Sequence, residues 1–403
     1  MQTDPEALVR NSSTFPLILR ALSLSMGAAI ALGIARFSYA LLLPPMKADL
    51  HWTFAQAGAL NTSIGVGYLI GALVFPLVAR HVPTNRLFLG GCVLTSACMA
   101  VPGLVDGFDA LIAQRAACGL FSAIIFVSGG ILASRLAASD TQHSGLVLGL
   151  FYGGVGLGIA LSALTVPAML GGGGGHGWQA SWVGLGVISA LCTALAWPVA
   201  AKMTADDRPP PATAIEGVIP PMRRCAVLMA AYGLFGIGYI GYMTFVVALL
   251  RGAGMNNSVV TAFLLVLGLA TIVSSKLWAG TLQRARGGGA LALFCCLLSV
   301  ATIIPAVSNT PIAAFASGIV FGGTFLSVVA STTAFVRHNL PTAQWSAGIS
   351  AFTIVFAAGQ IVGPVALGAI SDGVGLSRGF VYSAIILLFS GLLAMGQKPL
   401  TRA

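Results

Sequence analysis

Residues 17–43 read LILRALSLSMGAAIALGIARFSYALLL, an apolar run in which the only charged residues are Arg20 and Arg36. About 20 apolar residues are enough for a helix to cross the hydrocarbon core of a bilayer. The run is also longer than the apolar region of a signal peptide, which has about 7–15 residues. The stretch therefore predicts a retained first transmembrane helix and, with it, a helical membrane protein.

The composition of the whole chain agrees with this prediction. Hydrophobic residues make up 57% of the 403 residues, charged residues make up 7%, and the mean hydropathy is +0.94. Soluble domains carry about 25% charged residues, so this chain could not cover a water-exposed surface. The composition excludes a soluble enzyme, a nucleic-acid-binding protein and a disordered chain. At roughly 20 residues per crossing plus short loops, the length accommodates about 12 helices.

Apolar runs separated by short polar breaks recur along the whole chain. Only helices and closed barrels satisfy their backbone polar groups in lipid, and these runs are too long and too uniformly apolar for barrel strands. We therefore predict an all-α membrane protein with twelve transmembrane helices. The runs are 17–43, 54–79, 86–105, 109–134, 144–170, 180–201, 224–250, 257–282, 289–307, 311–336, 345–370 and 379–396.

The positions of Lys and Arg predict the orientation, because cytoplasmic loops are enriched in positive charge. With the N-terminus in the cytoplasm, the cytoplasmic side carries fourteen of these residues and the opposite side three. We expect a multi-pass membrane protein with both termini cytoplasmic. The same asymmetry explains most of the net charge of +10, so we expect no nucleic-acid partner. The fourteen are Arg10, Arg20, Arg80, Arg86, Arg135, Lys202, Arg208, Arg223, Arg224, Arg284, Arg286, Arg337, Lys398 and Arg402, and the three are Lys47, Arg251 and Arg378.

The longest polar break separates the sixth apolar run from the seventh. It contains Asp206, Asp207, Arg208 and three successive prolines, a composition typical of a linker. We therefore expect three parts in the chain. These are an N-terminal six-helix half (1–201), a cytoplasmic linker (202–224) and a C-terminal six-helix half (225–403).

The two halves resemble each other at a nearly constant offset. The segment Gly33–Tyr39 matches Gly236–Tyr242 after 203 residues, and Arg80 matches Arg284 after 204. A glycine pair in the fifth run matches one in the eleventh after 205. Three matches in one order indicate a duplicated six-helix unit with both copies in the same orientation. Two such halves create a midplane cavity that can open to either side in turn.

This pattern resembles the major facilitator superfamily of secondary transporters over nearly the whole chain. The resemblance rests on Arg115-x-x-x-Gly119, on Gly359-Gln360-x-x-Gly363-Pro364 and on the glycines Gly149, Gly153, Gly154, Gly156 and Gly158. More narrowly, Gly33-Ile34-Ala35-Arg36-Phe37 followed by Leu43-Pro44, and Gly236-Ile237-Gly238-Tyr239-Ile240, look like the bacterial YbfB/YjiJ group. The resemblance implies transport by alternating access without naming a cargo. Relatives mostly act as monomers, so we expect a monomer.

The resemblance also implies residues that control opening. In the superfamily an Asp-Arg pair follows helix 2 and is thought to lock the inner gate, but here Ala79 precedes Arg80 and Gln283 precedes Arg284. The sequence therefore does not predict that lock here. Small residues in helices 5 and 11 serve sliding or gating in the superfamily, although tight packing explains them equally well. The candidate gating residues are Arg80, Arg284, Gly154, Gly158, Gly359, Gly363 and Pro364.

Every acidic residue falls in a tail, a loop or a helix end, so no carboxylate lies in the middle of a predicted span. A proton-coupled exporter of cations usually needs such a carboxylate. That mechanism is therefore disfavoured, unless a helix-end acid such as Asp372 serves. The ten acids are Asp4, Glu6, Asp49, Asp106, Asp109, Asp140, Asp206, Asp207, Glu216 and Asp372.

Three basic residues do lie within predicted spans: Arg36, Arg115 and Lys276. Insertion of an ionisable side chain costs about 2.5–3.5 kcal/mol, so each is a functional candidate. A cavity with bases and no acid attracts anions, and a guanidinium can hold a carboxylate through two hydrogen bonds. Each base also has a structural alternative: backbone bonds for Arg36, an ion pair with a helix-end acid for Arg115, and snorkelling for Lys276.

Polar and aromatic residues complete the predicted substrate site. Tyr239 occupies the position of Arg36 in the second copy, and Tyr242 lies three residues further on the same helix face. Tyr152, Asn61 and Gln360 fall within the fifth, second and eleventh runs. A tyrosine can pack its ring and bond a carboxylate through its hydroxyl, or it can satisfy a local backbone group.

The sequence predicts neither an enzyme nor a cofactor or metal site. The seven cysteines lie in or beside apolar runs without a CxxC pair, and no nucleophile–base pair or phosphate-binding loop is present. We predict a secondary active transporter that moves a small organic anion across the inner membrane. The alternative is a proton-driven efflux pump for drugs or hydrophobic compounds. The partners are membrane lipid and a coupling ion, with proton, sodium and counter-anion all open.

Overall fold

The computed structural model describes residues 5–140, 143–172, 177–203, 222–341 and 344–400, and these residues form helices and short connections without strands. Twelve helices, some of them interrupted, are long and apolar enough to cross a membrane. The prediction of twelve spans in an all-α protein is confirmed. The helices are α1 (Pro5–Ala28), η1 (Ala29–Ile34), α2 (Tyr39–Asp49), α3 (Phe54–Val78), α4 (Thr84–Ala100), η2 (Val101–Gly103), α5 (Phe108–Ala138), α6 (Ser144–Gly172), α7 (Gly177–Ala200), η4 (Met222–Cys225), α8 (Ala226–Gly252), α9 (Asn257–Leu277), α10 (Ala279–Arg284), α11 (Gly289–Val307), α12 (Pro311–Gly322), α13 (Phe325–Asn339), α14 (Trp345–Val374) and α15 (Leu376–Met395).

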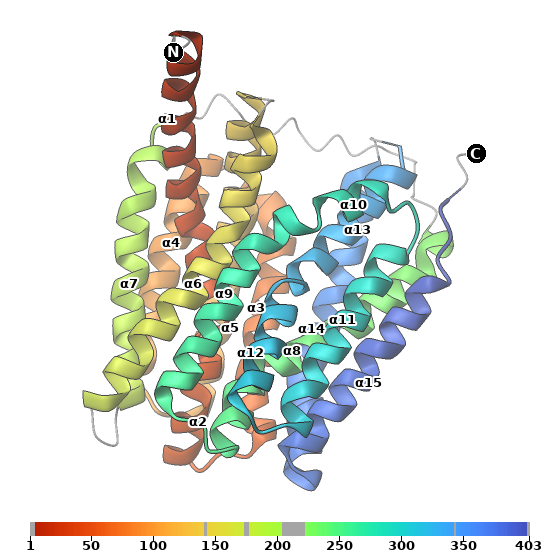
Figure 1. Ribbon diagram of the computed structural model, residues 1–403. Helices are drawn as coiled ribbons and strands as arrows, with labels where there is room; N and C mark the ends of the chain where they lie inside the picture. The colour runs from red at the N-terminus through yellow and green to blue at the C-terminus, as the bar shows by residue number, and fades with distance from the viewer. Residues whose placement is uncertain (1–4, 141–142, 173–176, 204–221, 342–343, 401–403) are drawn as a thin grey trace.

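The helices run side by side in a bundle, and α1 begins at the same end at which α15 finishes (Figure 1). Large apolar side chains cover the outside, as Leu73, Leu191 and Phe389 illustrate. This is the distribution expected when lipid, rather than water, surrounds the bundle. The sequence predicts a linker between the halves at 202–224. Residues 204–221 of this linker lie outside the described residues.

Two spans are interrupted in their middle. The first span passes through the π-helical segment η1 and then a turn at residues 35–38 before α2 begins. The backbone N–H of Ala35 donates to the Ile30 carbonyl, and that of Phe37 donates to the Leu32 carbonyl, both five residues back. The tenth span breaks between α12 and α13, at Gly323 and Thr324. Such breaks at membrane depth are tolerated where protein or a cavity surrounds them, and π-bulges are frequent at functional sites.

Glycines allow the helices of each half to pack closely. A Cβ on Gly158 would lie 2.4 Å from the Ala29 carbonyl oxygen, so α6 presses against η1. In the other half a Cβ on Gly359 would lie 2.3 Å from the Gly233 carbonyl oxygen, so α14 presses against α8. Helix 1 against helix 5 and helix 7 against helix 11 are equivalent pairs in the duplicated unit. Their close contact agrees with the internal repeat.

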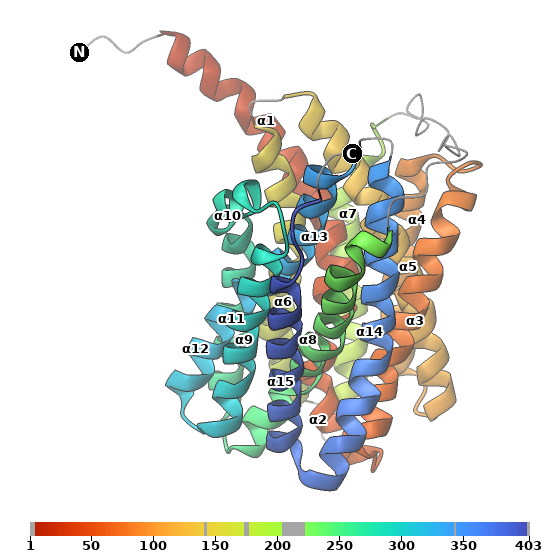
Figure 2. The same ribbon diagram turned by 90° about the vertical axis from the view of Figure 1, so that its right-hand side faces the viewer.

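The two halves meet through α3 against α14 and through α6 against α9 (Figures 1 and 2). A Cβ on Gly58 would lie 2.3 Å from the Pro364 carbonyl oxygen, and a Cβ on Gly156 would lie 2.3 Å from the Gly268 carbonyl oxygen. Without side chains at these glycines the helices of opposite halves come into backbone contact. Residues on α3 and α14 are thereby placed next to the break in the first span.

Candidate substrate site

Arg36 lies in the turn that interrupts the first span, and its side chain is only 5% exposed. Its Nη2 donates a hydrogen bond to Oε1 of Gln360 on α14, which belongs to the opposite half. Its Nε is buried and has no hydrogen-bond partner within the described ranges. In the described part of the chain Arg36 forms no ion pair. A buried guanidinium with a neutral amide as partner leaves a positive charge uncompensated.

Gln360 connects Arg36 to Tyr239. Because arginine can only donate, the amide oxygen of Gln360 must face it and the amide nitrogen faces away. That nitrogen donates to the Tyr239 hydroxyl at 2.6 Å. The hydroxyl therefore accepts this bond, and its own proton points elsewhere. The sequence named Arg36, Tyr239 and Gln360 as substrate-binding candidates from three different spans, and the fold brings them together.

Aromatic rings surround this polar chain. Tyr239 stacks on Phe235, Phe356 and Phe325 with ring centroids 4.7, 5.5 and 6.4 Å apart and interplanar angles of 19°, 20° and 11°. Phe325 directly follows the break in the tenth span, and Phe37 from the first break meets it edge-on at 5.9 Å. The two interrupted spans thus face each other beside Arg36. Discontinuous helices at the midplane are where transporters place their substrate sites.

Sequence reasoning missed several residues of this group: Tyr68, Phe235, Phe325 and Phe356. Tyr68 is half-buried on α3 and lies near Arg36, Tyr152 and Tyr239. A signal was present in the helical spacing. Tyr68 follows Asn61 by two turns, and Phe235 and Phe356 precede Tyr239 and Gln360 by one turn. Such pairs share a helix face.

Arg115 takes a different position from Arg36. It is 1% exposed, and its Nη1 donates to the Ala35 carbonyl oxygen at 2.8 Å. Its guanidinium lies over the rings of Tyr39 and Trp182, at 5.1 and 5.3 Å. It therefore satisfies a carbonyl at the helix break and stabilises the backbone that presents Arg36. Its Nε and Nη2 have no partner.

Asn61 joins the halves, whereas Tyr242 does not. Asn61 on α3 donates through Nδ2 to the Thr244 hydroxyl on α8 at 2.5 Å, and its Oδ1 is buried without a partner. Tyr242 bonds Ser317 at 2.7 Å and stacks on Phe321 at 3.8 Å, inside the C-terminal half. Tyr242 therefore packs within its own half and lies outside the group around Arg36.

The remaining substrate candidates are more exposed. Tyr152 on α6 is 41% exposed, contacts Phe126 and Phe151, and lies near enough to Tyr68 to interact with it electrostatically. It therefore borders the group around Arg36. Lys276 is exposed on the last turn of α9. The structure does not bring Lys276 into this group.

The gating candidates lie in three kinds of place: within one half, between the halves, and exposed at helix ends. Gly154 and Gly158 pack against α1 and η1, and Gly359 and Gly363 pack against α8, so all four lie within one half. Pro364 lies between the halves, with its carbonyl oxygen against Gly58. Arg80 follows the end of α3, Arg284 is the last residue of α10, and both are exposed.

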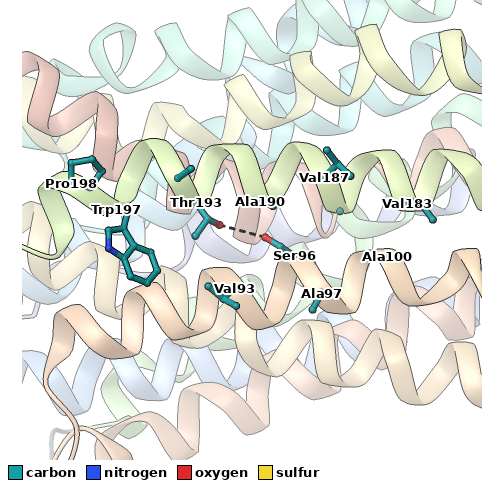
Figure 3. A pocket seen from close by; sticks show the side chains of 12 residues that line it. Val93, Ser96, Ala97, Ala100, Val183, Val187, Ala190, Thr193, Trp197 and Pro198 are labelled. Carbon is teal, nitrogen blue, oxygen red and sulfur yellow. Dashed lines mark hydrogen bonds between the residues drawn. The ribbon is translucent and has the colours of Figure 1, made fainter.

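A large groove of about 720 Å³ lies elsewhere, between α4 and α7 (Figure 3). Apolar and small side chains line it, with Ser96 and Thr193 facing each other at 3.4 Å across it. Several of its residues belong to the exposed apolar surface, including Val187 and Trp197. It has no charged group, so it is not the site that the sequence predicts.

A twelve-helix bundle whose halves meet at a buried arginine beside two interrupted helices has the architecture of a major facilitator transporter. The chain belongs to the family described as uncharacterised MFS-type transporter YbfB, whose model matches residues 28–395. It is accordingly a multi-pass membrane protein and a transporter, and members of this family are not enzymes.

Known proteins agree with this assignment. A relative from Streptomyces lividans, described as a chloramphenicol resistance protein, is 26% identical over 365 residues, which cover 86% of this chain and 89% of the relative. The crystal structure of the nucleoside transporter NupG has a TM-score of 0.71 at 14% identity, covering 95% of this chain and 99% of that one. A bacterial homologue of the human lysosomal transporter Spinster, inward-facing and unoccupied, has a TM-score of 0.70 at 13% identity, with 94% and 95% covered. These two structures support the fold alone.

Proposed function

We propose that this protein carries a small organic anion with a carboxylate group across the bacterial inner membrane by alternating access. The observation that carries the proposal is the state of Arg36. Its side chain is buried, and among the described residues it bonds only the neutral Gln360 and its Nε has no partner. An arriving carboxylate would supply the missing acceptor and neutralise the charge.

The rest of the described interior favours an anion as well. The acids Asp49, Asp106, Asp109, Asp140 and Asp372 lie at helix ends or in connections, away from Arg36. Arg115 adds a second positive charge close enough to interact with Arg36. Two guanidinium groups without a carboxylate produce a positive potential that selects negative ligands.

Alternating access is supported by how the halves are joined. Arg36–Gln360 and Asn61–Thr244 are single hydrogen bonds between the halves, whereas the backbone contacts at Gly58 and Gly156 need no side chain on those residues. Contacts of this kind can separate without unfolding either half. We propose that the halves 1–201 and 225–403 move as units around the 202–224 linker, in a monomer with both termini cytoplasmic. The proton, sodium and a counter-anion are the candidate coupling ions.

The test is a thermal-shift assay on the purified full chain with acetate, benzoate, succinate and citrate, followed by uptake of any stabilising anion into proteoliposomes. Ligands that bind the folded state raise the melting temperature as their concentration exceeds Kd. We expect stabilisation by at least one anion, and loss of both stabilisation and uptake in Arg36→Gln. Arg86→Gln removes an exposed arginine at the start of α4 and serves as the matched control. Stabilisation that survives in Arg36→Gln contradicts the proposal.

Efflux of a neutral hydrophobic compound is the second candidate, and the relative described as a chloramphenicol resistance protein favours it. In this case the hydrogen bond between Arg36 and Gln360 would be structural, and Arg36 would not bind the substrate. Chloramphenicol would then stabilise the wild-type protein and Arg36→Gln equally. The carboxylates would stabilise neither, which separates the two functions in one assay.

A further inference from the structure

We infer that the transported anion is an aromatic monocarboxylate, whose carboxylate binds Arg36 and Tyr239 and whose ring lies against the aromatic side chains beside them. This inference rests on the proposed function and narrows its substrate class. Two observations support it. Arg36 and Tyr239 have free hydrogen-bond donors, and the partly exposed side chains around them are aromatic.

Arg36 and Tyr239 keep hydrogen-bond donors that a carboxylate can use. Gln360 uses its oxygen toward Arg36 and its nitrogen toward Tyr239. The hydroxyl proton of Tyr239 and the other N–H groups of Arg36 remain for a ligand, among them the buried Nε–H, which has no partner among the described residues. A carboxylate has two oxygens and can accept one bond from each. Arg36 and Tyr239 can therefore bind both oxygens of one carboxylate.

Among the described residues near Arg36, no second cation is accessible to another carboxylate on the ligand. Arg115 is 1% exposed and is held against the Ala35 carbonyl, Tyr39 and Trp182. Lys276 is exposed at the end of α9, apart from the group. Burying an unpaired carboxylate is strongly unfavourable. A dicarboxylate or tricarboxylate is therefore a poor fit.

The non-polar part of the ligand would meet aromatic surface. Phe356 is the half-buried member of the stack that also contains Phe235 and Tyr239, and the Phe235–Phe356 planes differ by 9°. From the other half, Tyr68 and Phe126 are half-buried and Tyr152 is 41% exposed. Parallel rings with an open edge accept another flat ring in offset stacking, and such pairs are favourable beyond the area they bury. A planar aromatic ligand therefore fits better than a saturated one of the same size.

The experiment uses four ligands that separate charge from aromaticity: benzoate, benzamide, cyclohexanecarboxylate and cyclohexanecarboxamide. Binding to the purified full chain is measured by calorimetry or by thermal shift. We expect benzoate to bind about tenfold more tightly than cyclohexanecarboxylate, and both carboxylates to bind more tightly than their amides. Equal binding of the two carboxylates overturns the aromatic inference and leaves the anion proposal standing. Equal binding of benzoate and benzamide, or no binding of either carboxylate, overturns the anion proposal itself.

Phe356→Leu provides the second arm, because it removes the ring and keeps an apolar side chain of similar size. We expect about a tenfold loss of benzoate affinity and little change for cyclohexanecarboxylate, whose binding then shows that the variant is folded. Phe389→Leu, on the exposed surface of α15, is the matched control. An equal loss of affinity for benzoate and cyclohexanecarboxylate in Phe356→Leu would overturn the inference, because it would show that Phe356 contributes general packing rather than ring stacking.

Discussion

The carboxylate of Asp372, near the end of α14, caps the first turn of α3 in the opposite half: its Oδ1 accepts from the backbone N–H of Phe54 at 2.7 Å. Its Oδ2 accepts from the N–H of Ala55 at 2.9 Å. Thr53 and Gln56 form a capping box on the same turn, so the free N–H groups of this helix end are satisfied from both halves. A negative charge is favourable at a helix N-terminus. These bonds exist only while the halves are in contact at this end.

Asp372→Asn should shift the protein toward the state that is open at this end. The substitution removes the negative charge and one acceptor oxygen, which costs about 1.5 kcal/mol, or roughly tenfold in the equilibrium. Spin labels at Gly107→Cys and Gly252→Cys, where an added side chain meets no atom within 4 Å, report the distance between the halves. We expect a longer-distance population to increase. Asp109→Asn, an exposed acid in the first turn of α5, is the control. An unchanged distance distribution would mean that Asp372 is not a lock.

Gln360→Glu should block anion binding while stabilising the protein. The new carboxylate would pair with Arg36 and supply the acceptor that a ligand otherwise provides. We expect a higher melting temperature without ligand and at least a tenfold weaker response to benzoate. Gln360→Ala frees Arg36 without adding charge and should retain the response. Wild-type benzoate binding by Gln360→Glu would show that Arg36 does not meet the carboxylate.

The Asn61–Thr244 bond between the halves should contribute to stability in the described conformation. Asn61→Ala and Thr244→Val each remove one side of the bond, at a cost of about 1 kcal/mol. A double-mutant cycle of the free energies of unfolding should give a coupling energy of about 0.5–1.5 kcal/mol between the two side chains. Additive effects would indicate that the two side chains do not interact in the membrane.

Gly58→Ala and Gly154→Ala should have different consequences. A Cβ on Gly58 would meet the Pro364 carbonyl across the halves, and one on Gly154 would lie 2.2 Å from the Ser25 carbonyl within one half. Gly58→Ala should separate the halves, seen with the same spin labels, at little cost in melting temperature. Gly154→Ala should lower the melting temperature without changing the distance. The reverse pattern would assign gating to Gly154, as the family resemblance implied.

Sequence patterns were sufficient for the spans and for the centre of the site. Arg36 was identifiable because a charge in the middle of an apolar run is costly wherever the helix lies. Tyr239 followed from the internal repeat, and Gln360 from its place in the eleventh run. Phe325 gave no such signal, since aromatic residues in an apolar span are ordinary, and Tyr68 was marked only by its helical spacing from Asn61. Arg115 was, like Arg36, a base within a predicted span, and its contacts with the Ala35 carbonyl, Tyr39 and Trp182 separate their roles.

The sequence by itself determined that this chain is a twelve-helix membrane protein with basic residues, and no acidic ones, in the middle of its predicted spans. The physical reason is local: the transfer of apolar and charged side chains into lipid depends on each residue and its neighbours along the helix. The tertiary structure alone decided which residues face Arg36, that Asp372 caps α3, and that Gly58 rather than Gly154 lies between the halves. Gly58 and Pro364, like Phe54 and Asp372, are about 300 positions apart in the sequence. Whether such residues touch depends on how the helices are rotated and placed against one another.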